Sequence, residues 1–213
     1  EEERVTTVYQ GCSEAFSRIT PEEMQASRSL FALPRRYILF VGSIEERKNL
    51  GLIVEALSLL QDKELHLVAV GRKTPYTQLV LERARRLGVL SRLHLLHGVS
   101  GGNLPGIYAG AEVFVYPSRF EGFGIPIIEA LSAGVPVIGA TGSCLEEAGG
   151  PSSLYTDPTD ASMLATLIDR VVIDISLRKK MIEDGLHYVQ RFTPKRIAKD
   201  LSAIYEEVLL TYE

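Results

Sequence analysis

Short apolar runs alternate with longer amphipathic stretches along most of the chain. The runs lack polar alternation, which is typical of parallel strands that are covered on both faces. We predict six such strands, at residues 37–41, 65–70, 93–97, 113–116, 135–138 and 153–155.

Helical spacing of apolar residues separates these strands. The first helical face carries Leu50, Ile53, Val54, Leu57 and Leu60, and Asn49 before it is a candidate N-cap. A second face carries Leu79, Val80, Ala84 and Leu87, and Gly88 can end that helix. The alternation predicts right-handed βαβ units and an α/β fold, a doubly wound parallel sheet of about six strands.

The two ends of the chain differ from this pattern. Apolar residues after position 160 recur as three successive helices, so we predict a helical C-terminal tail, with the last helix at residues 194–213 packing back on the domain at 37–193. Residues 4–9 suggest a strand that ends at Gly11, but the polar stretch 21–29 has no place in a βα unit. We therefore interpret residues 1–36 as part of a different unit.

Size and charge narrow the class of protein. The 213 residues suit one large α/β domain, and a net charge of -4 lacks the positive field that nucleic-acid binding requires, so we expect no nucleic-acid partner. Cys12 and Cys144 fit no zinc spacing, and we expect two free thiols and no metal. Without a run of 18 apolar residues or a basic leader, the sequence indicates a soluble, cytoplasmic protein.

The loop after the first strand is a candidate anion site. In an open α/β sheet, ligands bind beyond the carboxyl ends of the strands. Gly42 and Ser43 follow the first strand, and Arg47 and Lys48 directly precede a helix, whose amide dipole favours an anion. The alternative is a solvated pair of cations that balances two neighbouring glutamates. The loop is neither a Walker loop nor a Gly-x-Gly-x-x-Gly fingerprint.

The loop after the fourth strand is the second candidate. Gly122 and Gly124 expose backbone amides, and Pro126 suits the first turn of the helix that follows. Glu121 in the loop and Glu129 one turn into the helix can reach one cleft, where a carboxylate suits a sugar diol. The alternative is a simple capping arrangement at the helix start.

These residues resemble a known family. The ten-residue stretch Glu-Gly-Phe-Gly-Ile-Pro-Ile-Ile-Glu-Ala, which holds Glu121 and Glu129, resembles the paired-glutamate signature of retaining family-4 glycosyltransferases of the GT-B fold, known as glycosyl transferases group 1. Residues 37–50, 104–118, 133–138 and 142–147 resemble further blocks of that family in order. Ser43 departs from it, since many members have Arg there. Glu146 stands where Pro is usual, which leaves open whether Glu146 or Glu147 faces the cleft.

The resemblance implies that residues 37–193 form a Rossmann-like domain that binds a nucleotide sugar, and that residues 1–36 are a remnant of an N-terminal domain and linker. Glu129 would accept ribose hydroxyls, and Glu121 would contact the transferred sugar. Arg47 and Lys48 would hold the diphosphate together with backbone amides, and Glu121 and Lys48 would be the catalytic residues. The implied donor site is Gly42, Ser43, Arg47, Lys48, Gly71, Arg72, His97, Val99, Glu121, Gly122, Phe123, Gly124, Ile125 and Glu129.

The resemblance also implies a reaction. A hexose would pass from a nucleoside diphosphate to a saccharide or lipid-linked acceptor with retention at the anomeric carbon, without a metal or other cofactor. The acceptor would be bound by an N-terminal domain, so this chain alone would be inactive, and any membrane contact would be peripheral, at the inner face. Two alternatives remain: a nucleotide-sugar epimerase of the same fold, and a non-catalytic docking subunit. Tyr108, Tyr116 and Tyr155 are interpreted as packing residues.

Overall fold

Six parallel strands form one sheet in the computed structural model, which describes residues 5–211. The strands are β1 (Tyr37–Val41), β2 (His66–Val70), β3 (Leu93–Leu96), β4 (Val113–Tyr116), β5 (Val137–Ala140) and β6 (Leu154–Thr156). Their order, β3-β2-β1-β4-β5-β6, is that of a doubly wound sheet, so the predicted fold class is confirmed. The direction of winding reverses between β1 and β4, where such sheets open a crevice.

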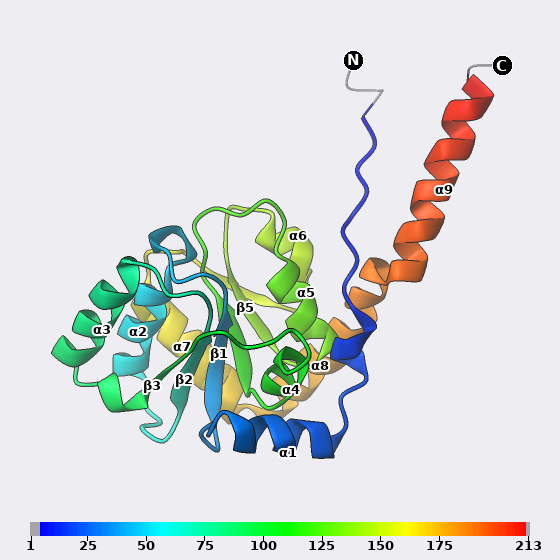
Figure 1. Cartoon of the computed structure of the whole chain (residues 1–213). Coiled ribbons are helices and arrows are strands. Elements are labelled where there is room, and N and C mark those ends of the chain that lie inside the picture. Colours follow the sequence, from blue (N-terminus) through cyan, green and yellow to red (C-terminus); the bar gives the residue numbers. More distant parts are fainter. Residues whose placement is uncertain (1–4, 212–213) are drawn as a thin grey trace.

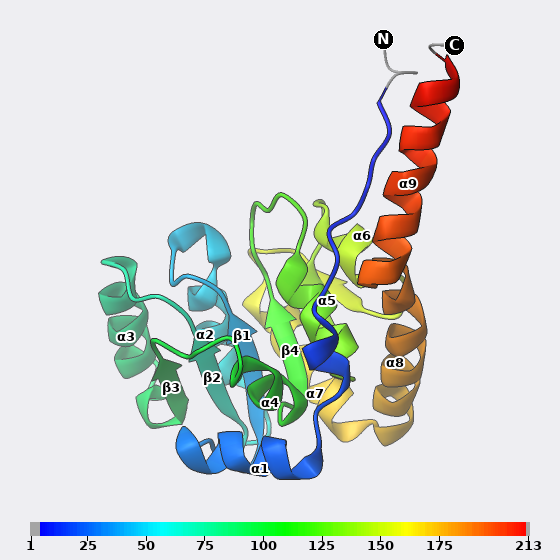
Figure 2. The same cartoon turned by 45° about the vertical axis from the view of Figure 1, so that its right-hand side comes forward.

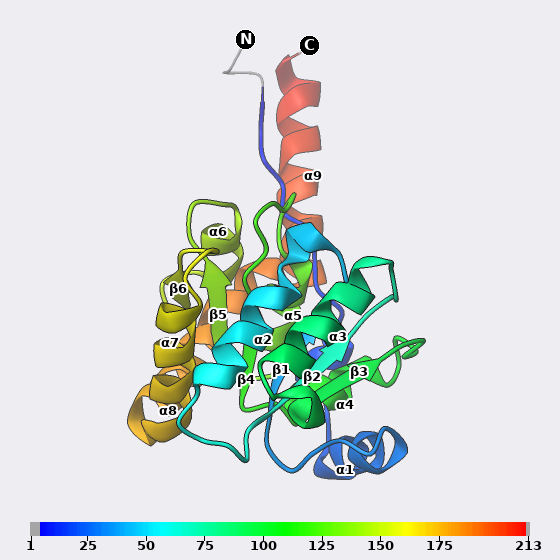
Figure 3. The ribbon, with the colours of Figure 1, turned by 90° about the vertical axis from the view of Figure 1, so that its left-hand side faces the viewer.

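Helices cover both faces of this sheet (Figure 1). The first face carries α2 (Leu50–Leu59), α3 (Tyr76–Arg86) and α7 (Ala161–Ile173), which lie in front of the strands in Figure 3. The other face carries α4 (Leu104–Ala109) and α5 (Ile125–Ser132). The remaining helical elements are η2 (Glu14–Ser17), α1 (Pro21–Leu30), η3 (Glu46–Lys48), η4 (Leu90–Arg92), α6 (Leu145–Gly149), α8 (Ile175–Tyr188), η5 (Val189–Phe192) and α9 (Pro194–Thr211).

The carboxyl ends of β1 and β2 are in very close contact. Gly42 N donates to Val70 O at 2.9 Å, and a Cβ atom built on Gly71 would lie 1.8 Å from Gly42 O. A side chain at position 71 would therefore force the two strand ends apart. This contact fixes the loop after β1, where the candidate cations lie.

Some predicted details are wrong. Asn49 occupies the N-cap position of α2 in a left-handed conformation with φ 61°, but its side chain does not cap the helix. Its Nδ2 instead donates to Pro117 O at 3.0 Å and to Pro158 O at 2.7 Å, which ties α2 to two distant loops. Strand β5 begins at Val137 rather than at residue 135, because Pro136 has no amide hydrogen for a strand ladder.

On α3, Leu79 and Leu87 are exposed, contrary to the predicted apolar face, while Val80 and Ala84 are buried. Most positions of this helix are polar, and its narrow buried stripe lies next to α2. Gly88 does follow its end with φ 71°.

Much of the segment 5–36 packs against the domain. Residues 5–13 are irregular where a strand was predicted, and position 4 of that prediction lies outside the described residues. From Cys12 onward the segment joins the core, where the Phe16 ring packs edge-on against Tyr108. The polar stretch is α1, which starts with a capping box between Thr20 and Glu23 and packs against α4.

The last helix also differs from its prediction. The three helices of the tail are present as α7, α8 and α9, but α9 extends away from the sheet beside residues 5–10 instead of packing back on it (Figures 1 and 2). Its side chains Tyr205, Leu209 and Leu210 are largely exposed. Across residues 5–211, no helix combines the length and the apolar character that crossing a membrane requires.

Candidate functional site

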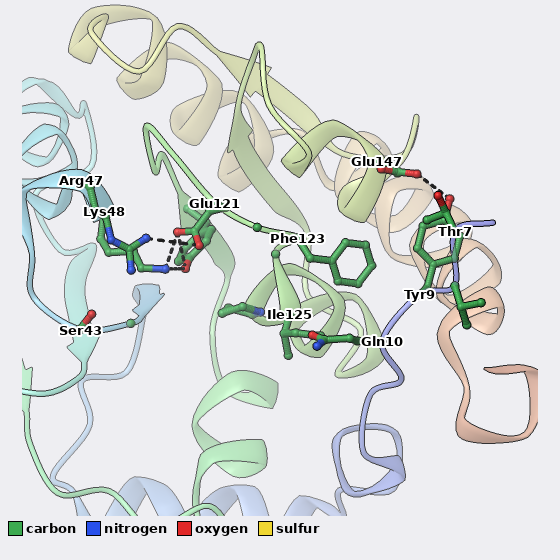
Figure 4. A pocket seen from close by; sticks show the side chains of 16 residues that line it. Thr7, Tyr9, Gln10, Ser43, Arg47, Lys48, Glu121, Phe123, Ile125 and Glu147 are labelled. Atoms are coloured by element: carbon green, nitrogen blue, oxygen red, sulfur yellow. Dashed lines mark hydrogen bonds and ion pairs between the residues drawn. The ribbon is translucent and has the colours of Figure 1, made fainter. Parts of the chain in front are cut away.

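A cleft of about 690 Å³ lies at the carboxyl ends of β1 and β4 (Figure 4). Its walls come from the loops after those two strands, the start of α5, α6 and the irregular N-terminal segment. The lining residues are Thr7, Val8, Tyr9, Gln10, Gly42, Ser43, Arg47, Lys48, Tyr116, Glu121, Gly122, Phe123, Gly124, Ile125, Pro126 and Glu147. Nine of the sequence-predicted site residues thus lie in one cavity.

Lys48, Glu121 and Tyr116 form a closed hydrogen-bonded cluster at one end of this cleft. The Lys48 ammonium, at the end of η3, donates to Glu121 Oε1 and to the Tyr116 hydroxyl, the latter at 2.6 Å. Tyr116 in turn donates to Glu121 Oε1 at 3.0 Å. The Lys48 and Glu121 side chains are each only 10% exposed, so this is a largely desolvated ion pair.

Arg47 lies beside this cluster and is more accessible. Its Nη1 donates to Phe120 O at 3.1 Å and lies 3.7 Å from Glu121 Oε2, and its Nε donates to Glu45 at 3.1 Å. Its carbonyl oxygen accepts from Arg119 N at 2.8 Å, which fastens η3 to the loop after β4. The two candidate cations are therefore not a freely solvated pair; both point toward Glu121.

The charge of Glu121 is set by its neighbours. Burial raises its pKa, but hydrogen bonds with Lys48, Ser118 and Tyr116 and the Lys48 charge together hold the pKa below its ordinary value. Glu121 is thus an ionised carboxylate that accepts hydrogen bonds in the cleft.

The start of α5 forms the middle of the cleft wall. Gly124 precedes the helix with φ 120°, and a Cβ there would lie 3.1 Å from Leu145 and Ala148, so both conformation and space favour glycine. No side chain caps this helix. The Ile127 and Ile128 amides donate to Gly124 O at 2.9 and 3.4 Å, and Pro126 has no amide hydrogen. The Ile125 amide at the helix start, with the positive end of the dipole, suits an anion next to Lys48.

No sequence pattern indicated that Tyr9 lines the far end of the cleft. Tyr9 stacks on Phe123 with ring centroids 5.6 Å apart, and its hydroxyl donates to Glu147 Oε1 at 2.6 Å. Glu147, rather than Glu146, therefore faces the cleft. The irregular segment around Tyr9 has no periodicity that could have indicated this position.

The predicted base-pocket residues lie outside the cleft, at the ends of β2 and β3. One ring nitrogen of His97, Nδ1, is 2.6 Å from Gly71 O. Arg72 is exposed, 3.7 Å from Glu45 Oε1, and Val99 packs partly against the core.

Glu129 is also outside the cleft, contrary to our expectation that it shares one cleft with Glu121. Its Oε2 accepts a hydrogen bond of 2.8 Å from the buried Tyr108 hydroxyl, because its side chain lies on the α5 face that turns toward α4. Burial raises the pKa of Glu129 despite this hydrogen bond. Among residues 5–211, no three His, Cys, Asp or Glu side chains are grouped so that they could hold a metal ion, and Cys12 and Cys144 are free thiols.

The fold and cleft define a class. A parallel sheet with an uncapped helix start, a buried Lys48 and an accessible Arg47 at its carboxyl edge is typical of proteins that bind phosphate groups of nucleotides. Residues 22–187 match the family model described as glycosyl transferases group 1, and the chain belongs to this family.

Individual relatives agree with this assignment. The chain is 31% identical to the O-antigen chain mannosyltransferase B of Escherichia coli over 198 residues, covering 90% of this chain and 51% of that protein. Anabaena HepE, solved in complex with UDP and glucose, superposes with a TM-score of 0.88 at 18% identity. The superposition covers 97% of this chain and 58% of HepE. The C-terminal domain of LpcC, a group 1 family protein from Francisella tularensis, superposes with a TM-score of 0.72 at 19% identity, covering 84% of this chain and 97% of that domain.

These relatives show a GT-B glycosyltransferase fold. The chain spans about half the length of the mannosyltransferase it matches.

Proposed function

We propose that the cleft binds a nucleoside-diphosphate sugar and that this chain supplies the donor half of a retaining hexosyltransferase. The observation that carries the proposal is the buried Lys48–Glu121 pair next to the uncapped start of α5. It brings a cation, an ionised carboxylate and the N-terminus of a helix to one cavity. The cation and the helix N-terminus suit a diphosphate, and the carboxylate suits a sugar diol.

The diphosphate would lie against Arg47, Lys48 and the amides around Gly124. These groups stabilise the charge that develops on the leaving diphosphate as the sugar departs, so the reaction needs no metal or other cofactor. The base would extend toward Gly71 and His97 at the neighbouring strand ends, with Arg72 and Val99 on the same rim.

Two glutamates would hold the sugars of the donor. Glu121 would accept hydroxyls of the transferred hexose. Glu129 would accept a ribose hydroxyl with Oε1, since its Oε2 is engaged by Tyr108 and no described hydrogen bond uses Oε1.

In the reaction, the bond from the anomeric carbon to the diphosphate oxygen breaks, and the acceptor oxygen bonds to the same face of that carbon. The acceptor proton passes to the leaving diphosphate, and the anomeric configuration is retained.

The similar proteins suggest the sugar and the acceptor only broadly. One is named for mannose transfer to an O-antigen chain, and another was solved with UDP and glucose. We therefore propose a hexose donor and a saccharide or lipid-linked acceptor. The acceptor would be bound by a further domain, so this chain would bind donor but transfer little sugar.

Calorimetric titration of the 213-residue chain with UDP, GDP, ADP and their hexose conjugates tests the proposal. We expect one nucleotide to bind, and its sugar conjugate to bind more tightly because Glu121 then gains hydroxyl partners. Absence of binding by all of them would contradict the proposal and favour a docking subunit. Epimerised sugar, rather than intact donor, after incubation with labelled conjugate would favour the epimerase.

A further inference from the structure

The aromatic ring of Tyr116 is part of the core, but its hydroxyl is part of the cleft. The ring packs at 5.8 Å from Phe114 and 6.0 Å from Phe40, and the residue is 1% exposed. As the last residue of β4, it has its side chain fixed by the sheet, and its hydroxyl ends beside Lys48 and Glu121. Our interpretation of Tyr116 as a packing residue therefore describes only the ring.

The hydroxyl of Tyr116 uses both of its hydrogen-bonding functions inside the cluster. Its oxygen accepts from the Lys48 ammonium at 2.6 Å, while its proton goes to Glu121 Oε1 at 3.0 Å. The Lys48 ammonium also lies 5.1 Å from the centroid of the Tyr116 ring, within the range of a cation–π contact. Tyr116 thus contacts both members of the ion pair at once.

The partners of Tyr116 are less constrained than Tyr116 itself. Lysine has a flexible four-carbon stem and three rotatable donors, so an ion pair with Glu121 alone would not define one position for its ammonium. A tyrosine locked by packing has no such freedom, and its hydroxyl offers a fixed reference point for both charges.

We propose that Tyr116 is a positioning residue, whose hydroxyl holds the Lys48 ammonium and the Glu121 carboxylate in the geometry that receives the donor. This proposal rests on the proposed function for its effect on ligand binding, but the positioning of the two charges is a property of the chain itself. When a diphosphate engages Lys48, Tyr116 still donates to Glu121, so the carboxylate stays oriented toward the sugar.

The test is Tyr116→Phe, which keeps the packed ring and removes only the hydroxyl. The matched control is Tyr37→Phe, because Tyr37 is an equally buried strand tyrosine whose hydroxyl donates at 2.6 Å to Ile107 O, away from the cleft lining. Tyr37→Phe loses one buried hydrogen bond and Tyr116→Phe loses two, so a purely structural role predicts a loss of thermal stability in both variants and no difference in function.

The first measurement needs no ligand. Carbon-13 NMR titration of the Glu121 carboxyl should give a higher pKa in Tyr116→Phe than in the wild-type chain, and an unchanged pKa in Tyr37→Phe. The groups that face Glu121 are Lys48 and Arg47 from η3, Tyr116 from β4, Ser118 in the loop after β4 and Cys144 before α6. Glu129 from α5 acts on Tyr116. Of these groups, Tyr116→Phe changes only Tyr116. An unchanged Glu121 pKa in Tyr116→Phe would overturn the inference even if no nucleotide binds.

The second measurement is calorimetric binding of the nucleotide that the wild-type chain prefers. Tyr116→Phe should weaken its affinity about tenfold, equivalent to about 1.4 kcal/mol, with Tyr37→Phe unchanged. Affinity within twofold of wild type would overturn the positioning role while leaving the proposed function intact. If the wild-type chain binds none of the nucleotides, the proposed function fails and the carboxyl titration alone decides the role of Tyr116.

Discussion

Replacing Lys48 with methionine removes the buried ammonium while keeping most of the side-chain volume. Glu121 would keep Tyr116 as a donor and Arg47 at 3.7 Å, but would lose its closest charge partner. Breaking a fully buried pair costs about 3–5 kcal/mol. Because Arg47 remains and the cleft is open to water, we expect the free energy of unfolding to fall by about 2 kcal/mol.

The loss should depend on pH in a defined direction. The pKa of Glu121 is lowered in the folded chain, so its ion pair stabilises the fold above the unfolded-state value of about 4.3 and ceases to do so as the pH falls through the folded-state pKa. Lys48→Met removes most of that contribution. The stability difference from wild type, measured by urea unfolding, should be greatest near neutral pH and shrink below about pH 4.

The same substitution should weaken binding of the preferred nucleoside diphosphate. A hydrogen bond to a charged group contributes about 1.5–3 kcal/mol, but Lys48 must give up part of its contact with Glu121 to make it, so we expect about a tenfold rise in Kd by calorimetry. Lys179→Met on α8 removes the same charge from an exposed site and should leave Kd unchanged. A Kd within twofold of wild type, or a stability difference independent of pH, would refute the reasoning.

Two further substitutions test other parts of the structure. Burial raises the pKa of Glu129, so its carboxylate destabilises the fold once the pH rises above the pKa of the unfolded state. Glu129→Gln should therefore raise the melting temperature at pH 7 but not at pH 4. An equal effect at both pH values would contradict an origin in the buried charge. Gly71→Ala should reduce the free energy of unfolding by about 3 kcal/mol or more, because the new Cβ would lie 1.8 Å from Gly42 O. Gly102→Ala, with open space around the residue, should change this free energy little. Equal effects of the two substitutions in urea unfolding would show that the strand ends can separate freely.

The fold could be predicted from the sequence where burial is uniform. Strands β1 and β4 begin and end where the apolar runs predict, because a strand covered on both faces needs apolar side chains along its whole length. The two loops of the cleft followed from the rule that parallel strands present their carboxyl ends at one edge.

The prediction was poorer where local chemistry, rather than periodicity, determines the structure. The helix α1 has a mostly polar sequence and packs through few apolar side chains, so hydrophobic spacing gave no sign of it. The Thr20 and Glu23 spacing with Pro21 between them is nevertheless a capping-box signal that could have indicated its start.

The sequence indicated which residues belong to the candidate site, but not which of them contact one another. Lys48 and Glu121 lie 73 positions apart, and only the fold shows that they meet. Glu129 has the right spacing for the cleft, yet its side chain accepts a hydrogen bond from the Tyr108 hydroxyl of α4 and does not line the cleft. Tyr9 lies in an irregular segment, where no pattern relates its position to the distant Glu147.

The internal pairing of Lys48 and Glu121 makes entry of any anion into this cleft an exchange reaction. An incoming anion gains a cation only by competing with a carboxylate that is already bound to it. A small ion such as chloride or inorganic phosphate would leave Glu121 with a weakened partner and nothing to replace it. A ligand that carries hydroxyl groups a few ångströms from its negative charge compensates both sides of the pair, so the cleft is built to discriminate against the simple anions that are abundant in any cell.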